Sequence, residues 1–385
     1  MSAIKYSELK KRYELDGAAQ TVRHLSEALE KRDLAPEDFS IRDLAETMVP
    51  NGRDWVGRMA PGTGCVLTEA EGLDATAFLN LTGQLIYNKI LEAYKNEAFR
   101  LSEAVSTVST RLDGERIPGV TPIKDDVTEV RPGMPYPNLG FGEDYIDTPS
   151  TTKRGLIVPV TREAVFFDRT HLILSRAAEV GEILALNKEK RIADMILGLT
   201  SLYSRKGISY STYYAGNSGE PWKNLLASNE LTDQTSVDAA ENIFADMTDP
   251  NSGEPVLIEA DTVLVMPAKR FTAAEIFASQ KLTYSDGTLR SVTNPFSSYK
   301  IIASRIAYRQ LLASDPASAT AFSKYWFIGN FKKAFAYMEN WPITVTHSAT
   351  DSEADFSQDI VARYKASERG TPAVLDPRCV VKCTA

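Results

Sequence analysis

The sequence contains few of the residues on which most metal sites and many enzymes depend. Among its 385 residues there are three histidines and three cysteines. The histidines, His24, His171 and His347, are far apart, and no two of them have the spacing of metal ligands. An odd, sparse set of cysteines indicates reduced thiols and no disulfide framework. We therefore expect no metal site and no cofactor.

Long hydrophobic runs and an excess of positive charge are missing as well. No apolar run approaches the roughly 18 residues that suggest a membrane span, and the N-terminus has no apolar core of a signal peptide. We therefore expect a chain that stays in the cytosol, without a membrane partner. The net charge is −8, so the protein as a whole is not a strongly basic nucleic-acid binder. Any nucleic acid that the protein encloses would be contained with few direct contacts.

Short catalytic motifs are also scarce. There is no Gly-x-x-x-x-Gly-Lys-Ser/Thr phosphate loop. The segments 62–64 and 140–142 are Gly-x-Gly pairs that lack the third glycine and the strand–helix setting of a dinucleotide site. The segment 216–219 lacks the Gly-x-Ser-x-Gly pattern of a hydrolase. We therefore expect no catalytic residues and no enzyme.

The composition that remains is that of a globular protein, with 43% hydrophobic and 24% charged residues. The length suits one large or two ordinary domains. Apolar residues at helical spacing predict four helices in the N-terminal quarter. These are 6–15, 19–31, 41–48 and 74–98.

One central stretch organises the rest of the chain. It begins with a loop rich in proline and glycine, Arg131 to Gly142, and continues into an apolar strand, Gly155 to Thr161. A long helix is predicted over Arg169 to Leu197, with a start signal in Asp168 and a stop signal in Gly198. At about 29 residues it would span roughly 44 Å. Such a plan suits a subunit that reaches its neighbours better than an enzyme pocket.

The predicted long helix has one apolar stripe, and we expect Lys188 to Arg191 to form its solvated or interfacial face. The stripe consists of Ile173, Ala177, Val180, Leu184, Ile192, Met195 and Ile196.

The loop before this helix carries more large apolar side chains than a loop left in water should have. Either the loop folds back on its own core, or it is an arm buried against another subunit. We favour the arm, and take the two basic residues at its base as further contact candidates. The candidates for inter-subunit contact are Tyr136, Leu139, Phe141, Tyr145, Lys153 and Arg154.

The pattern changes to alternating strands and helices at Thr235. A capping-box-like start at Thr235 to Asp238 opens a helix. Buried-strand runs follow at Thr262 to Met266, Lys300 to Ala303 and Tyr325 to Ile328. We expect a compact α/β domain over roughly 235–342.

The C-terminal tail returns to strands. Trp341 to Thr346, Ile360 to Ala366 and Cys379 to Cys383 have strand character, and Glu368 to Gly370 reads as a turn. We predict that these strands pair with the segment Leu156 to Val160, beside the long helix.

Four strings of residues carry a resemblance to a known family. They are Gly142 to Asp168, Asn187 to Arg191, Asp246 to Pro255 and Trp341 to Val345. Together with the order of elements they resemble the major capsid proteins of tailed bacteriophages, whose shell fold is shared with encapsulins and herpesvirus capsid floors. The resemblance covers roughly residues 75–385.

The resemblance implies an α+β fold with an N-terminal arm, an extended β-hairpin loop, a peripheral domain with a long spine helix, and an inserted α/β axial domain. The implied boundaries are 1–121 for the arm and its helices, 122–155 for the extended loop, 156–234 for the peripheral domain with spine helix 168–198, 235–342 for the axial domain, and 343–385 for the C-terminal strands of the peripheral domain.

The implied function is self-assembly into hexamers and pentamers that form an icosahedral shell around double-stranded DNA, without sequence-specific binding. Portal, scaffold and decoration proteins are the implied further partners, in a virion assembled in the cytoplasm of a bacterial host. Some relatives crosslink through a lysine on the extended loop, but Lys153 lies near the base of this loop, so that chemistry is not carried over. We expect no cleavage of the N-terminal segment, which is short for a scaffold.

Two other functions remain open at this point. One is an encapsulin-like shell that holds protein cargo instead of DNA. The other is a cytosolic α/β enzyme with a lid at 131–142.

Overall fold

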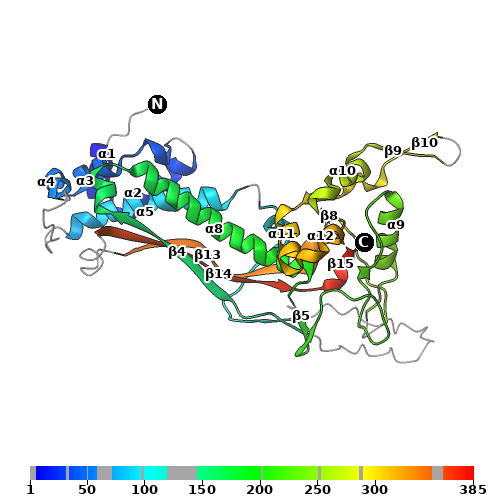
Figure 1. Cartoon of the computed structure of the whole chain (residues 1–385). Coiled ribbons are helices and arrows are strands. Elements are labelled where there is room, and N and C mark those ends of the chain that lie inside the picture. The colour runs from blue at the N-terminus through cyan, green and yellow to red at the C-terminus, as the bar shows by residue number, and fades with distance from the viewer. Residues whose placement is uncertain are drawn as a thin grey trace, which may run out of the picture. The chain divides into compact units, whose positions relative to one another are not determined.

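The protein is described by a computed structural model, shown in Figure 1. The described residues are 6–31, 34–49, 51–58, 72–96, 99–118, 145–200, 203–249, 253–285, 289–348 and 359–385. The chain forms two compact units. The first unit gathers Met1–Ala98, Lys153–Asn187 and Trp341–Arg369, and the second gathers Phe99–Thr152, Lys188–Asn340 and Gly370–Ala385. The mixture of helices and sheets confirms the predicted α+β class, while the five predicted region boundaries stay predictions.

The first unit begins with helices that the sequence predicted. Helix α3 shows why they form: the Ser40 side chain accepts a hydrogen bond from the Asp43 amide at its start. Its buried residues Ile41, Leu44 and Met48 recur at helical spacing. The predicted helices are α1 (Tyr6–Asp16), α2 (Ala18–Glu30), α3 (Ile41–Met48) and α5 (Gly72–Tyr94). Two short helices, α4 (Gly52–Arg58) and α7 (Arg162–Phe166), were not predicted.

The predicted long helix is confirmed as α8 (Thr170–Leu197), 28 residues long. At its start the Thr170 hydroxyl donates to the Asp168 carboxylate at 2.8 Å. At its end Gly198 takes a φ of +73°, and the amides of Gly198 and Leu199 donate to the carbonyls of Met195 and Asp194. These two bonds form a Schellman motif, which favours glycine because its φ is positive. Residues 170–187 belong to the first unit and 188–197 to the second.

The prediction that Lys188 to Arg191 form the solvated or interfacial face of this helix is wrong for Glu189, which is buried, whereas Lys190 is exposed and Lys188 and Arg191 are half-buried. Glu189 is 1% exposed and accepts hydrogen bonds from the amides of Leu101 at 2.7 Å and Ser102 at 3.0 Å. Burial raises the pKa of its carboxyl group. The cationic groups of Lys188 and Arg191 lie over the Tyr337 ring, 4.2 and 5.7 Å from its centre. Charged residues can therefore face a core when backbone amides and an aromatic ring receive them.

A four-stranded sheet has the order β1 (Ser106–Ser109), β13 (Phe335–Ser348), β14 (Ile360–Val374), β4 (Thr152–Thr161). The neighbouring positions of β14 and β4 confirm the predicted pairing of the 360–366 segment. The predicted pairing of Trp341 to Thr346 with β4 is wrong, because β13 lies between β1 and β14. The predicted turn at Glu368 to Gly370 is wrong, because β14 runs through it. A Cβ at Gly370 would lie 2.6 Å from the Tyr337 ring, so the glycine permits close packing within a strand.

A second sheet, of five strands, forms the core of the second unit. Its order is β11 (Lys300–Ala303), β8 (Thr262–Val265), β12 (Trp326–Gly329), β15 (Val380–Cys383), β7 (Leu225–Leu226). The predicted strands at 262–266, 300–303 and 325–328 are confirmed. The predicted partner of β15 is wrong: β15 pairs with β12 and β7 instead of the segment 156–160. Val380, Val381 and Cys383 are all buried, so β15 suits a sheet covered on both faces.

Helices and smaller sheets surround this core. The predicted start of α9 at Thr235 is two residues late, because Asp233 is the N-cap and accepts from the Thr235 amide at 3.0 Å. The other helices are α6 (Leu101–Ala104), α9 (Gln234–Ala245), α10 (Arg270–Ala273), α11 (Arg305–Ser314), α12 (Ala319–Phe322) and α13 (Phe331–Ala334). The other strands are β2 (Arg116–Pro118), β3 (Tyr145–Asp147), β5 (Tyr203–Arg205), β6 (Ile208–Tyr210), β9 (Lys281–Ser285) and β10 (Leu289–Thr293).

Candidate assembly surface

Strand β4 in the first unit has an exposed half that includes two large apolar residues. Each residue from Thr152 to Ile157 is exposed, while Val158 and Val160 are buried. Leu156 is 37% exposed and Ile157 is 56% exposed. Among the described residues β4 has a neighbouring strand on one side only, namely β14. An apolar edge strand of this kind is a template for contact with another chain.

Glycine fixes how closely β4 approaches β14. A Cβ at Gly155 would lie 2.6 Å from the Ala366 carbonyl oxygen, so the backbone of β4 lies tightly on its neighbour at that point. At its other end the strand passes into α7, where the Thr161 hydroxyl accepts from the Ala164 amide. Strand β4 is therefore fixed at Gly155, within its exposed half, and at its C-terminal end.

The predicted contact residues Lys153 and Arg154 lie on this exposed half of β4. The Lys153 ammonium is 5.9 Å from the centre of the Trp341 ring, and the Arg369 guanidinium is 5.6 Å from the same ring. Each such cation–π contact contributes about 0.5–1 kcal/mol at an exposed site. Two cations beside one indole make this surface attractive to an acidic or aromatic partner.

The other predicted contact residues are placed differently. Tyr136, Leu139 and Phe141 lie outside the described residues. Tyr145 is in β3 of the second unit, half-buried, with the Arg116 guanidinium 4.7 Å from its ring centre. Arg116 is also paired with Asp147 at 2.9 Å. Tyr145 is therefore packed in the sheet of its own unit and is not grouped by the structure with Lys153 and Arg154.

Other large apolar residues are exposed and were not among the predicted contact candidates. Leu172 and Ile183 are exposed on α8, and Phe167 is exposed just before it. Leu172 and Ile183 lie outside the apolar stripe of the long helix. An apolar residue outside the buried stripe of a helix is a sequence signal for an exposed contact, and it could have identified these two. In the second unit the exposed large apolar residues are Leu112, Leu199, Ile208, Leu257 and Phe271.

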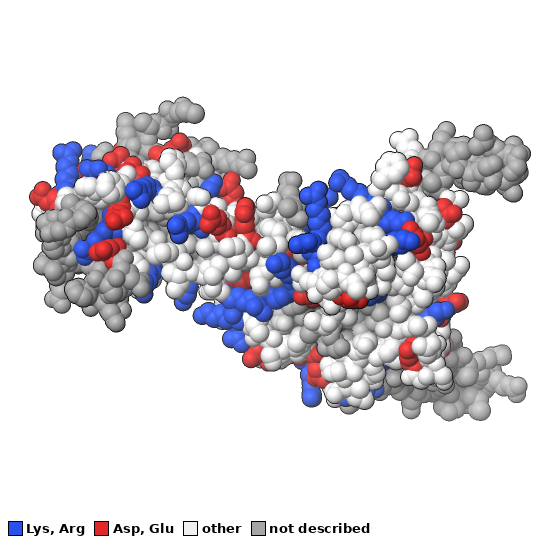
Figure 2. Space-filling view, viewed as in Figure 1, with Lys and Arg blue, Asp and Glu red and all other residues white. Residues whose placement is uncertain are grey.

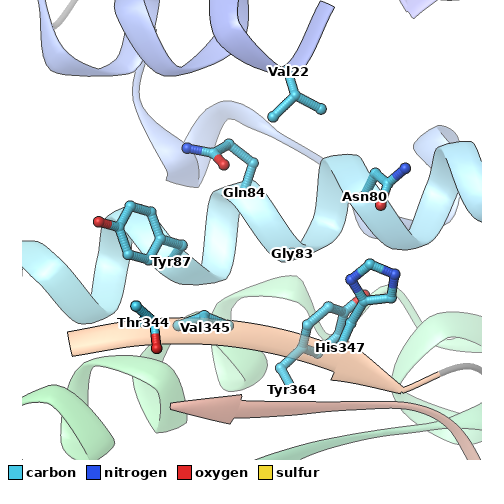
Figure 3. Close-up of a pocket in the computed structure, with 9 residues that line it drawn as sticks. All are labelled: Val22, Asn80, Gly83, Gln84, Tyr87, Thr344, Val345, His347 and Tyr364. Atoms are coloured by element: carbon cyan, nitrogen blue, oxygen red, sulfur yellow. The ribbon is translucent and has the colours of Figure 1, made fainter. Parts of the chain in front are cut away.

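A cleft of about 370 Å³ in the first unit lies between α2, α5 and the strands β13 and β14 (Figure 3). His347 is its only imidazole, and the ring lies 6.4 Å from that of Tyr364. Tyr364 donates a hydrogen bond to the Leu79 carbonyl, and burial raises the pKa of its phenol. Among the described residues neither a carboxylate nor a thiol lines the cleft, and the Thr344 hydroxyl donates to the Ser367 carbonyl at 3.2 Å.

The described residues contain no metal-binding cluster and no reactive thiol. They contain no group of three or more histidine, cysteine, aspartate or glutamate residues placed to hold a metal ion. Cys379 and Cys383 are free and buried, and burial raises the pKa of each thiol to about 12. Thiols with such pKa values stay protonated and unreactive near neutral pH. Among these residues, no helix is both long and apolar enough to cross a membrane.

Comparison with known protein families identifies the chain. A family profile described as "Phage capsid protein" matches residues 145–383, which is more than half of the sequence. The chain belongs to the phage capsid protein family. This confirms the resemblance to the major capsid proteins of tailed bacteriophages. A comparison with curated protein sequences finds no match.

Solved capsid structures are similar at low sequence identity. The capsid of a native GTA particle has 11% identity and a TM-score of 0.45, over 75% of this chain and 90% of that one. The capsid of Cyanophage P-SCSP1u has 14% identity and a TM-score of 0.41, over 73% and 85%. The holo-SrpI encapsulin complex from Synechococcus elongatus PCC 7942 has 12% identity and a TM-score of 0.40, over 74% and 86%.

Proposed function

We propose that this capsid protein assembles into hexamers and pentamers, and that these close into an icosahedral shell around double-stranded DNA. The observation that carries the proposal is the family match over residues 145–383. The exposed apolar half of β4 supports it, because Leu156 and Ile157 would be covered by a neighbouring subunit. Obligate contacts between subunits often bury more than about 2,000 Å².

The candidate contacts keep their place in this proposal. The loop side chains Tyr136, Leu139 and Phe141, together with Tyr145, would reach a neighbour, and Lys153 and Arg154 would extend the same contact. Many moderate contacts per subunit make a shell stable only as a whole. Each contact that forms raises the effective concentration of the neighbouring subunit for the next contact. Portal, scaffold and decoration proteins are the further partners that such a shell would need.

The DNA would be enclosed without sequence-specific binding. The net charge of −8 supports containment, because a subunit of this sign repels the phosphate backbone on average. In the same proposal the protein has no catalytic role, and it is assembled in the cytoplasm of a bacterial host.

Electron microscopy of the purified protein tests the proposal, combined with measurement of nuclease-protected DNA from particles made in infected or induced cells. We expect closed shells of uniform size that protect double-stranded DNA. Closed shells that contain protein cargo and no DNA would instead favour the encapsulin-like function. A monomer or dimer under all conditions, seen by light scattering, would contradict a shell protein altogether.

A further inference from the structure

The central sheet of the second unit has two chemically different ends. Strands β8 and β11 are parallel, with Thr262 opposite Lys300 and Val265 opposite Ala303. The starts of both strands therefore lie at one end of the sheet, which we call the entry end. Helices α10 and α11 follow the other ends of these strands, which we call the exit end. Four residues of strand separate the two ends by about 10–13 Å.

The entry end contains an apolar pocket of about 400 Å³ with acidic residues at its edge. Its apolar lining includes Phe244, Val256 and Ile258, and Leu257 beside them is 91% exposed. Two carboxylates, Glu241 and Glu259, also line it. The Tyr299 hydroxyl donates a hydrogen bond to Glu241, which fixes one wall of the pocket.

The exit end carries a large apolar side chain that is exposed to solvent. Phe271 on α10 is 74% exposed. It follows the exposed Arg270, and Arg305 and Arg309 are exposed on α11. Figure 2 shows blue side chains gathered over the region of α10 and α11. An exposed phenyl ring flanked by arginine is typical of an interface anchor.

We propose that Phe271 of one copy inserts into the entry-end pocket of the next copy, with Arg270 facing Glu259 and Glu241. The inference rests on the proposed function and names a contact within its rings. Because Phe271 and the pocket lie at opposite ends of one sheet, Phe271 does not enter the pocket of its own chain. The contact is head-to-tail, and head-to-tail contacts close into rings when the rotation between copies closes.

Charge selects this occupant over the other ways of pairing two copies. Two entry ends would bring carboxylates together, and two exit ends would bring arginines together, so both symmetric pairings are disfavoured. Lys300 at the entry end and Glu275 after α10 are exposed and run against the pattern. Arg270 is next to Phe271 and Glu259 lines the pocket, so substitutions of these two residues test the charge pairing most directly.

The test is a charge exchange in the full-length chain, with assembly followed by sedimentation velocity and electron microscopy. Arg270→Glu alone and Glu259→Arg alone should each raise the protein concentration needed for assembly about fivefold or more. Both changes in one chain should restore assembly, since every contact then again joins opposite charges. Arg176→Glu, on the exposed face of α8 in the first unit, is the matched control and should assemble as the wild type does.

The apolar part of the contact is tested by Phe271→Ala, which should raise the same concentration about tenfold or more. The side chain is exposed, so the variant should keep the circular dichroism and melting temperature of the wild-type subunit. If the wild type forms shells while Phe271→Ala and both single charge variants assemble normally, the inference fails and the shell function stands. The inference fails in the same way if the double charge variant is no better than the single ones. If the wild type itself never assembles, both fail.

Discussion

Strands β8 and β4 have similar apolar sequences and opposite surroundings. All four residues of β8, in the second unit, are buried between neighbouring strands and helices. In β4, in the first unit, six consecutive residues are exposed, among them Leu156 and Ile157. The same residue types therefore complete a core in one place and leave an open surface in the other.

The difference shows where this protein's folding ends and its assembly begins. Burial of β8 is satisfied within one chain, so its apolar residues stabilise the subunit directly. The exposed residues of β4 contribute little until something covers them. Matched substitutions in the two settings should separate effects on the subunit from effects on the shell.

Isoleucine offers the matched pair with the largest expected difference. Ile328 on β12, next to β8, is fully buried, whereas Ile157 on β4 is 56% exposed. Ile328→Ala should lower the free energy of unfolding of the isolated subunit by about 2–5 kcal/mol, because it leaves a cavity. Ile157→Ala should lower it by less than about 1 kcal/mol. Urea titration of the unassembled subunit measures both.

Assembly should reverse the order of these two variants. Folded Ile157→Ala subunits should need a higher protein concentration to form shells, because the covered apolar area is smaller. Equal losses of subunit stability in the two variants would remove the distinction between β4 and β8. Normal assembly of Ile157→Ala would remove β4 from the contact surface.

Glycine extends the comparison from strands to helices. A Cβ at Gly181 of α8 would lie 2.4 Å from the Ile90 carbonyl oxygen of α5, whereas a Cβ at Gly57 of α4 would meet nothing within 4 Å. Gly181→Ala should therefore destabilise the subunit by about 1–3 kcal/mol through overpacking. Gly57→Ala should stabilise it by about 0.5–1 kcal/mol, since alanine is the better helix former. Thermal unfolding of both variants checks the signs, and stabilisation by Gly181→Ala would show that the two helices can separate without cost.

Much of this fold could be predicted because its signals are local. The long helix carries its own start at Asp168 and its own stop at Gly198, and both are seen in the structure. The buried strands β8 and β11 appear in the sequence as short apolar runs. Signals of this kind depend on a few neighbouring residues, so they can be recognised without knowing the tertiary contacts.

The failures concern contacts between residues far apart in the sequence. The burial of Glu189 depends on amides near residue 101, which helical spacing does not reveal. The partner of β15 could not be chosen, because Val380 to Cys383 suits any covered sheet. The buried Asp249 carboxylate pairs with Arg378 at 2.6 Å, and the two residues are 129 positions apart in the sequence. Of the predicted contact residues, Lys153 and Arg154 are exposed in the structure. The exposed Phe271 and the entry-end pocket were not predicted, because solvent exposure depends on packing between residues far apart in the sequence.

Lysine gives the third matched pair and the smallest expected effect. Lys382 is half-buried, and its ammonium donates to the Leu197 carbonyl at the end of α8 and lies 5.4 Å from the centre of the Tyr213 ring. Lys153 lies over Trp341 on the exposed part of β4. Burial lowers the pKa of Lys382 to about 8.

The sign of the pH dependence follows from this lowered pKa. Below about pH 8 Lys382 is charged in both states, and its burial costs stability. Between about pH 8 and the unfolded pKa of about 10.4 the unfolded chain binds more protons, so stability rises with pH. From pH 7 to 9 the free energy of unfolding of the wild-type subunit should gain about 1 kcal/mol relative to Lys382→Met. Burial raises the pKa values of Tyr213 and Tyr325, and tyrosines in the unfolded chain ionise near pH 10, outside this window. Urea titrations at pH 7, 8 and 9 provide the measurement, with Lys153→Met to report the effect of losing one positive charge at an exposed site. Parallel pH profiles for the wild type and Lys382→Met would mean that the ammonium is as well accommodated in the core as in water.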